Sequence, residues 1–183
     1  MKVIASLAML LMFYSVSLAQ CKSLAEAAQQ PREIDSLDLC GCSLNQFPAE
    51  ILKMKNLKVL YLGPRRMIMY QSNAGSPIKG NLFKHLPESF GRLRSLEVLD
   101  LQATDLRELP DSFEKLQVLK ELDLSFNPRL DTASLFEILP RLESLQTLNL
   151  TGCNLDEAST LRLETLLQHT HCVFNKARII ARD

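Results

Sequence analysis

The feature that most constrains this chain is a set of leucines that recurs at a fixed interval. From Leu96 to Leu119 the sequence is LEVLDLQATDLRELPDSFEKLQVL, and the opening pattern L-x-x-L-x-L returns at Leu119, 23 residues after Leu96. A period of about 20 to 29 residues is typical of repeat architectures that stack one strand per unit. No single unit of this length can bury its own leucines, so we expect the units to fold as one stacked array.

The same opening recurs along most of the chain. Repeats start near residues 34, 57, 96, 119 and 145, and a degenerate last unit near residue 169 ends in Cys172-Val173-Phe174. Two intervals depart from 23 residues: 26 residues separate the starts at 119 and 145, and 39 separate those at 57 and 96. The longer interval predicts an insertion at about 64–80.

The second half of each repeat is also regular. Three prolines are each followed three residues later by an apolar residue, in the pairs Pro48 and Ile51, Pro87 and Phe90, Pro110 and Phe113. Proline suits the first turn of a helix because its φ is already fixed. Apolar residues spaced by three then place one stripe inward. Each unit is therefore predicted to be a short strand followed by a helical or 3-10 turn.

These motifs resemble the 23-residue LxxLP class of leucine-rich repeat, and the chain resembles small exported bacterial (Bacteroidetes-like) proteins of that class. The resemblance implies an α/β solenoid, a right-handed superhelix with short parallel strands on the concave face and helical or 3-10 turns on the convex face. It implies partner binding on the concave face. It also places the family's asparagine, which bonds the backbone between repeats, at five positions: Cys42, Arg65, Thr104, Asn127 and Cys153.

The two ends of the chain have their own patterns. Residues 1–19 combine Lys2, an apolar run and the small residues Ser17 and Ala19, which predicts a signal peptide cut after Ala19. Residues 20–33 predict an N-terminal capping helix, with Ser23 and Glu26 as a capping box. Residues 175–183 form a basic C-terminal tail.

Cys21 leaves a second possibility open. Leu18-Ala19-Gln20-Cys21 resembles the lipobox of bacterial lipoproteins, although Gln20 replaces the usual small residue. A lipid on Cys21 would anchor the protein to a membrane. Of the five cysteines, Cys42 and Cys153 are interpreted as small buried hydrophobes. Cys21 with Cys40 is the one disulfide considered.

Alternate strand residues face opposite sides of a sheet, which sorts the outward positions into columns. The central column, expected to contact a partner, is Asp38, Tyr61, Asp100, Asp123 and Asn149. The preceding column is Ser36, Val59, Val98, Glu121 and Thr147. The following column, also expected to face outward, is Cys40, Gly63, Gln102, Ser125 and Thr151. The alternative is a solvated acidic face without a partner.

The insertion carries a different chemistry. The segment 63–84 contains basic residues and no Asp or Glu, and it includes Arg65, Arg66, Met67 and Tyr70. Arginine, tyrosine and methionine are enriched at the centres of protein interfaces. We therefore include these four residues among the partner-binding candidates. The alternatives are an excursion without a partner, or a loop that masks the aspartate column.

Other functional classes lack support in the sequence. The 21 basic and 21 acidic residues balance, which argues against nucleic acid and anionic membranes as partners. No catalytic motif occurs, no cofactor is expected, and His169, His171 and Cys172 lack a fourth metal ligand.

We therefore predict an exported, non-enzymatic module, secreted or held at the cell envelope, in the periplasm or on the surface. Its concave sheet and 63–84 loop would hold a protein or peptide, with a glycan as a second ligand class, and the protein is expected to be monomeric. The alternative is a lipid-anchored structural or assembly component of the envelope without a soluble ligand.

Overall fold

A computed structural model describes residues 24–64 and 80–174. The predicted signal peptide, Cys21, the predicted loop candidates Arg65, Arg66, Met67 and Tyr70, and the tail 175–183 lie outside the described residues. Within the described part, no helix combines the length and apolar character needed to cross a bilayer.

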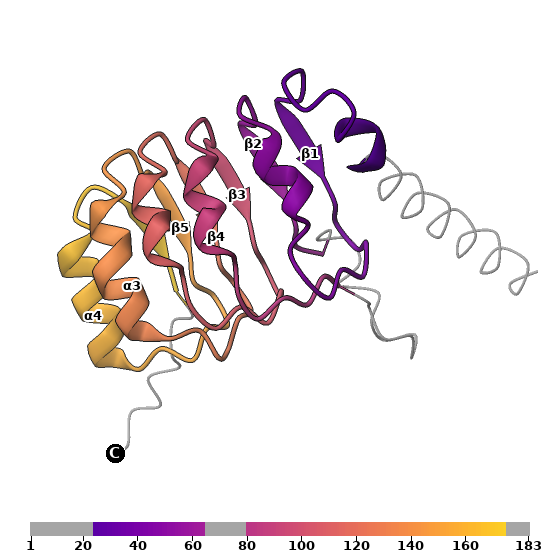
Figure 1. Ribbon diagram of the computed structural model, residues 1–183. Helices are drawn as coiled ribbons and strands as arrows, with labels where there is room; N and C mark the ends of the chain where they lie inside the picture. The colour runs from indigo at the N-terminus through magenta and orange to yellow at the C-terminus, as the bar shows by residue number, and fades with distance from the viewer. Residues whose placement is uncertain (1–23, 65–79, 175–183) are drawn as a thin grey trace, which may run out of the picture.

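The strands form one parallel sheet whose order follows the chain (Figure 1). They are β1 (Ser36–Asp38), β2 (Val59–Tyr61), β3 (Val98–Asp100), β4 (Glu121–Asp123), β5 (Thr147–Asn149) and β6 (His171–Val173). Each strand with its following turn is one rung of the solenoid. The register sets Leu37 level with Leu60 and continues through every rung to Cys172, which pairs with Leu148. The predicted parallel ladder is confirmed.

Helical segments lie on the other side of the molecule from the sheet (Figure 1). Three rungs carry 3-10 helices: η1 (Ala49–Lys53), η3 (Glu88–Arg92) and η4 (Asp111–Lys115). Their inward residues Ile51, Phe90 and Phe113 are fully buried. The strand face that turns away from the helices is the concave face of the predicted solenoid.

The prolines sit one position earlier than predicted. Pro48, Pro87 and Pro110 are the N-cap residues, with φ near −70° and an extended ψ of 117°, 150° and 149°. The expectation that they occupy the first turn was therefore wrong. The fixed φ of proline suits both extended and helical backbone, and here the chain is still extended when it reaches the proline.

The last two full rungs use α-helices instead. These are α3 (Thr132–Ile138), continued by the 3-10 segment η5 (Leu139–Arg141), and α4 (Glu157–Leu166). Each α-helix is capped by an aspartate: Asp131 accepts from the Ser134 amide at 3.2 Å and Asp156 accepts from the Ser159 amide at 2.8 Å.

The core is a continuous stack of aliphatic side chains with an aromatic row on the helical side. Phe90 stacks on Phe113 with ring centroids 5.4 Å apart, and Phe47 meets Phe90 edge-on at 5.3 Å. At the N-terminal end, residues 24–27 are helical and Ala27 is buried. This segment packs against the core, and residues 28–33 form turns and a bend, so the described helix is shorter than the predicted span of 20–33.

Buried asparagines connect the rungs. The Asn127 side-chain oxygen accepts from the amides of Thr104 at 3.1 Å and Leu106 at 2.9 Å. Its amide nitrogen donates to the carbonyls of Leu101 and Leu124, each at 2.9 Å. One side chain thus satisfies four backbone groups where the chain turns away from the sheet, groups that would be costly to bury unpaired.

Asn81 performs the same task for the second rung. Its amide nitrogen donates to Leu39 at 2.9 Å and to Leu62 at 2.8 Å, and its oxygen accepts from the Leu44 amide at 2.9 Å. The repeat motif assigned this position to Arg65, before the insertion. The asparagine of the second rung instead comes after the insertion. There, Asn81 bonds to carbonyls of both the first and the second rung, Leu39 and Leu62.

The cysteine assignments need correction. Cys42 is disulfide-bonded, so it is not a small buried hydrophobe. Cys40, considered as a disulfide partner of Cys21, is buried and is not part of a disulfide. Cys153 is buried and free, as predicted, and its thiol donates to the Leu124 carbonyl at 3.2 Å. Cys42 and Cys153 share a repeat position, and the bond of the Cys153 thiol to a backbone carbonyl corresponds to the role of the asparagine.

Candidate partner-binding face

The central column of the concave face lies as the repeat spacing implies. Asp38 is level with Tyr61, Tyr61 with Asp100, Asp100 with Asp123, and Asp123 with Asn149. Five side chains predicted as partner contacts therefore stand in one row across five adjacent strands. The other candidates, in the loop and at Cys21, are outside the described residues.

The acids of this row have a structural task. A side-chain oxygen of Asp38 accepts from the Cys40 amide at 2.9 Å, and Asp100 does the same for Gln102 at 2.8 Å. Asp123 accepts from both the amide and the hydroxyl of Ser125, at 2.9 Å and 2.5 Å. Such bonds to the backbone two residues on are the usual way in which Asp and Asn form turns. The acidic column therefore holds the ends of its own strands.

Asn149 continues this pattern and links two rungs. Its side-chain oxygen accepts from the Thr151 amide at 3.1 Å, and its side-chain nitrogen donates to Asp123 at 3.0 Å. The Asp123 carboxylate thereby receives donors from two rungs. A ligand at this end of the face would have to compete with those internal donors.

The following column does not face outward as predicted. Cys40, Gly63, Gln102 and Ser125 are buried, and only Thr151 is partly exposed. The alternation of a strand does not extend to these positions, because the aspartate-held turn begins directly after each strand. The exposed concave face is therefore narrower than the sequence indicated, two columns instead of three.

An apolar centre lies at the second and third rungs. Val59 pairs with Val98 in the register, and both are half-buried on the concave face. Tyr61, on the same strand as Val59, is 38% exposed. Among the strand residues that the structure describes, it is the one side chain of the Phe, Tyr or Trp type. We call Val59, Tyr61 and Val98 the apolar centre.

Gly63 fixes the position of the neighbouring acid. A Cβ atom at this residue would lie 2.5 Å from an Asp100 carboxylate oxygen and 2.9 Å from the Gln102 Cβ. The Asp100 side chain therefore folds over Gly63, beside Tyr61. Substitution of this glycine would push the carboxylate away from the Gln102 amide that it holds.

The insertion leaves and rejoins the solenoid close to this centre. Pro64, the last described residue before it, is buried and lies three residues after Tyr61. After the insertion, the Phe83 amide donates to the Thr104 carbonyl of the third rung at 2.9 Å. The chain has therefore rejoined the second rung at this point. Both ends of the insertion are thus held near the C-terminal end of β2.

The histidines and cysteines of the described residues do not gather into a metal site. Within residues 24–64 and 80–174, no group of three or more His, Cys, Asp or Glu side chains could hold a metal ion. His169 lies in a turn, whereas His171 and Cys172 lie in β6. Burial raises the pKa of Cys153 to about 11, and burial also raises the pKa of Cys172. Raised pKa values disfavour the nucleophilic thiolate.

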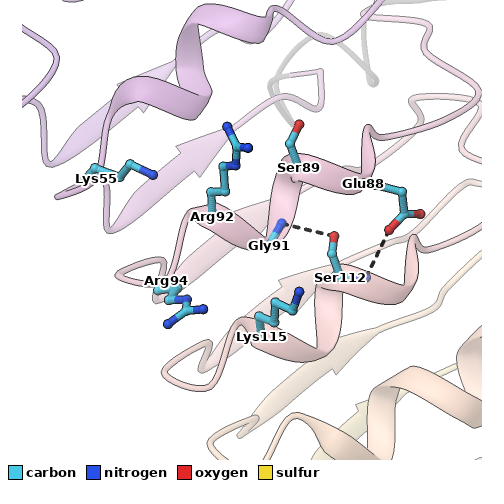
Figure 2. A pocket seen from close by; sticks show the side chains of 8 residues that line it. All are labelled: Lys55, Glu88, Ser89, Gly91, Arg92, Arg94, Ser112 and Lys115. Carbon is cyan, nitrogen blue, oxygen red and sulfur yellow. Dashed lines mark hydrogen bonds between the residues drawn. The ribbon is translucent and has the colours of Figure 1, made fainter.

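A basic hollow on the helical side was missed by the sequence reasoning. Its floor lies at Gly91 and its rim carries Lys55, Arg92, Arg94 and Lys115 (Figure 2). The available signal was a basic residue in the last turn of each short helix. Lys53, Arg92, Lys115 and Arg141 all occupy this place.

Comparison with known proteins agrees with the ladder. Residues 78–128 and residues 144–168 each match a model described as leucine rich repeat. No curated protein sequence matches the chain.

Solved structures with a similar fold include an internalin from Listeria monocytogenes, with 16% identity and a TM-score of 0.47, which aligns with 81% of this chain and 46% of its own. A leucine-rich repeat protein from Leptospira interrogans has 20% identity and a TM-score of 0.30, over 82% and 52% of the two chains. The mouse RP105/MD-1 complex contributes a third, at 17% identity and 0.38, over 77% and 30%.

The chain spans between 30% and 52% of the length of these solved chains. At these low identities, the similarity concerns the fold and gives no information about function. The two matched segments and the six-stranded parallel ladder with its helical turns support a leucine-rich repeat protein, and its fold is the α/β solenoid that such repeats form.

Proposed function

We propose that this protein is an exported, non-enzymatic module that binds a protein or peptide through the apolar centre of its concave face. Leucine-rich repeat proteins generally mediate protein binding, and that general role is consistent with the fold. The finer proposal assigns the contact to Val59, Tyr61 and Val98, with Asp38 and Asp100 on either side of Tyr61 in the register.

The observation that carries this proposal is the exposure of Tyr61 within an otherwise polar row. Interface centres are enriched in tyrosine and depleted of charge, and a polar rim surrounds them. Tyr61 has two valines beside it and aspartates on both neighbouring strands. Asp123 and Asn149, farther along the row, bond to each other at 3.0 Å and offer less to a partner.

The insertion strengthens the proposal because its ends are anchored beside the apolar centre. Its Arg65, Arg66, Met67 and Tyr70 remain candidate contacts by residue type. A variant from which Met67–Lys79 is removed tests their part. If that variant captures the same partners as the parent with equal affinity, the loop is not a contact.

A photo-crosslinking experiment tests the face itself. Benzoylphenylalanine is placed at Tyr61, and in a matched control at Val118, an exposed residue on another part of the surface. We expect a partner from a cell-surface extract to form an adduct at position 61 and none at 118. The adduct should also disappear when unlabelled parent protein competes. Equal adducts at both positions, or none at 61, would refute the concave-face proposal.

Export is supported by two observations of different kinds. The first 19 residues have the pattern of a signal peptide. Cys42 is disulfide-bonded, and disulfides persist in oxidising compartments outside the cytosol.

The disulfide also bears on the lipid-anchored alternative. Cys40, Cys153 and Cys172 are not part of a disulfide, so Cys21 is the remaining cysteine of the sequence if the bridge closes within one chain. One sulfur cannot carry both a disulfide and a lipid thioether. Titration of the denatured, unreduced protein should then give three thiols, and five after reduction. Four thiols after reduction, with a mass increase on Cys21, would favour the lipid anchor.

A further inference from the structure

A hollow of about 790 Å³ lies on the helical side of the solenoid, away from the concave face. Lys55, Arg92, Arg94 and Lys115 line it, and we call this set the basic groove (Figure 2). Arg92 and Lys115 end the neighbouring helices η3 and η4. The other lining residues are Glu88, Ser89, Gly91 and Ser112, so no apolar side chain and no aromatic ring takes part.

The hollow exists because η3 and η4 approach each other at a glycine. A Cβ atom at Gly91 would lie 2.2 Å from the Ser112 carbonyl oxygen, closer than any side chain can come. The Gly91 amide also donates to the Ser112 hydroxyl at 3.2 Å (Figure 2). The two helices are therefore held together with backbone at the floor of the groove, and the long basic side chains stand around it.

The next pair of rungs shows what an ordinary arrangement looks like. There, Glu114 lies directly after the buried Phe113, and its carboxylate pairs with Arg141 of the following rung at 2.5 Å. The residues equivalent to Glu114 in the earlier rungs are Gly91 and Leu52, which have no carboxylate. Lys115 and Arg92 therefore lack the partner that Arg141 has.

The charge of the groove is not cancelled from elsewhere in the described part of the chain. Across residues 24–64 and 80–174, the ion pairs involve His85, Lys120, Arg129 and Arg141, and none involves the four basic residues of the groove. Glu88, the one acid in the lining, accepts from the Ser112 amide at 3.4 Å (Figure 2). The groove thus carries four positive charges and one negative charge.

The hollow continues along the solenoid. A second hollow of about 720 Å³ shares Arg94 and Lys115 with the first. Its other lining residues are Glu114, Gln117, Pro140, Arg141 and Glu143, and Glu114 pairs with Arg141, so this hollow is mixed in charge. The cations of the first hollow come from three successive rungs, Lys55 from the first, Arg92 and Arg94 from the second and Lys115 from the third. A ligand with anionic groups repeated along its length suits this geometry better than a single ion.

We propose that the basic groove binds a linear anionic glycan, one that carries sulfate or uronate groups along its chain. Arginine and lysine bind sulfate and carboxylate oxygens through charge-assisted hydrogen bonds. Because no aromatic ring lines the groove, the bases of a nucleic acid would have no surface on which to stack. Because no apolar side chain lines the groove, it has neither an anchor for a protein partner nor a group that could insert into a lipid surface.

The proposal is tested with the full chain and a sulfated hexasaccharide from heparin, by calorimetry at low and at physiological salt. The double variant Arg92→Gln, Lys115→Gln should lower the affinity about tenfold, at roughly a factor of three per lost contact. The control Lys58→Gln, Lys120→Gln also removes two positive charges, but outside the groove, and should leave the affinity within about twofold. Affinity of the parent should fall as salt rises, because surface charges are screened.

A gain-of-binding variant makes the test independent of loss of fold. Glu114→Gln removes the partner of Arg141 and adds an uncompensated cation to the end of the groove, so binding should tighten by about twofold to fivefold. Equal losses in both double variants would show a net-charge effect and overturn the proposal. It is also overturned if the parent fails to bind the hexasaccharide, or if phosphatidylglycerol vesicles or single-stranded DNA bind more tightly in a groove-dependent way.

Discussion

The second and third rungs differ from the fourth and fifth in how they use their polar side chains. On the concave face, Asn149 of the fifth rung bonds to Asp123 of the fourth, and on the helical side Arg141 of the fourth rung pairs with Glu114, which ends the third. At the second and third rungs, Tyr61 is exposed on the concave face. Arg92 and Lys115 are without an ion pair among the described residues.

This contrast separates two uses of one repeat. Backbone geometry and buried leucines are the same in both regions, because every rung must continue the ladder. Toward the C-terminal end, neighbouring rungs bond to each other through Asn149 and Asp123 and through Arg141 and Glu114, whereas Tyr61 is exposed at the second rung. We infer that the earlier rungs carry recognition and the later rungs mainly complete the solenoid.

The largest expected effect tests whether the insertion interrupts the ladder or only extends from it. Asn127→Ala removes a buried side chain that satisfies four backbone groups and should lower the free energy of unfolding by about 3 kcal/mol. Asn81→Ala should cost nearly as much, since it holds three groups. Urea unfolding followed by circular dichroism measures both. A loss below about 1 kcal/mol for Asn81→Ala alone would show that the second rung is not completed after the insertion.

A pH dependence should distinguish the fifth rung, where a thiol replaces the asparagine. The unfolded thiol has a pKa near 9.0, and burial raises the pKa of Cys153 in the folded protein to about 11. Below pH 9 both states keep the proton and the stability is fully present. As pH rises from 9 through 11, the unfolded state loses its proton first, so stability falls by up to about 2 kcal/mol.

The comparison for that experiment is Cys153→Ala, unfolded in urea at pH 8 and at pH 11. Other groups also titrate in this range, so the difference between parent and variant is the informative quantity. The parent should lose more stability than the variant on going to pH 11. Equal losses would mean that Cys153 is ionised as easily in the folded protein as in the unfolded chain.

The next effect concerns the apolar centre. Gly63→Ala places a Cβ atom against Asp100 and should cost about 1–2 kcal/mol, because the carboxylate must leave the Gln102 amide. Gly80→Ala is the control, since its Cβ atom would meet nothing closer than the Ala103 carbonyl oxygen at 3.7 Å. Thermal unfolding of the two variants should differ by several degrees. Partner binding should weaken only in Gly63→Ala.

The smallest effect sharpens the contrast on the helical side. Glu114→Gln breaks an exposed ion pair and should lower stability by about 0.5 kcal/mol. Lys115→Gln, which breaks no ion pair among the described residues, should be neutral or slightly stabilising. Parallel urea titrations at low salt can resolve the difference. A larger loss in Lys115→Gln than in Glu114→Gln would mean that the groove charge is compensated after all.

Much of the architecture could be predicted from spacing. The interval of 23 residues places Leu37, Leu60, Leu99, Leu122 and Leu148 level in the sheet, as found. The inward residues after each proline are buried as expected. The central column could be predicted too, because strand alternation is a local rule.

The finer details of the surface could not be predicted. That Asp100 holds the Gln102 amide, or that Asp123 meets Asn149, depends on side-chain direction and on the neighbouring rung. The outward position of Cys40 and Ser125 was wrong for that reason. Asn81 stands 23 residues before Thr104, whereas Arg65 stands 23 residues after Cys42, so the spacing alone offers both positions and the insertion between them decides for Asn81.

The amino-acid sequence by itself determined the ladder, because leucines at a regular interval can leave water only when the units stack. Only the tertiary structure decided which surface groups are satisfied. Residues 91 and 114 are equivalent in sequence, yet one opens a hollow and the other closes an ion pair. Whether a polar side chain is satisfied depends on what the adjacent rung presents to it, and that contact lies 23 to 27 residues away along the chain.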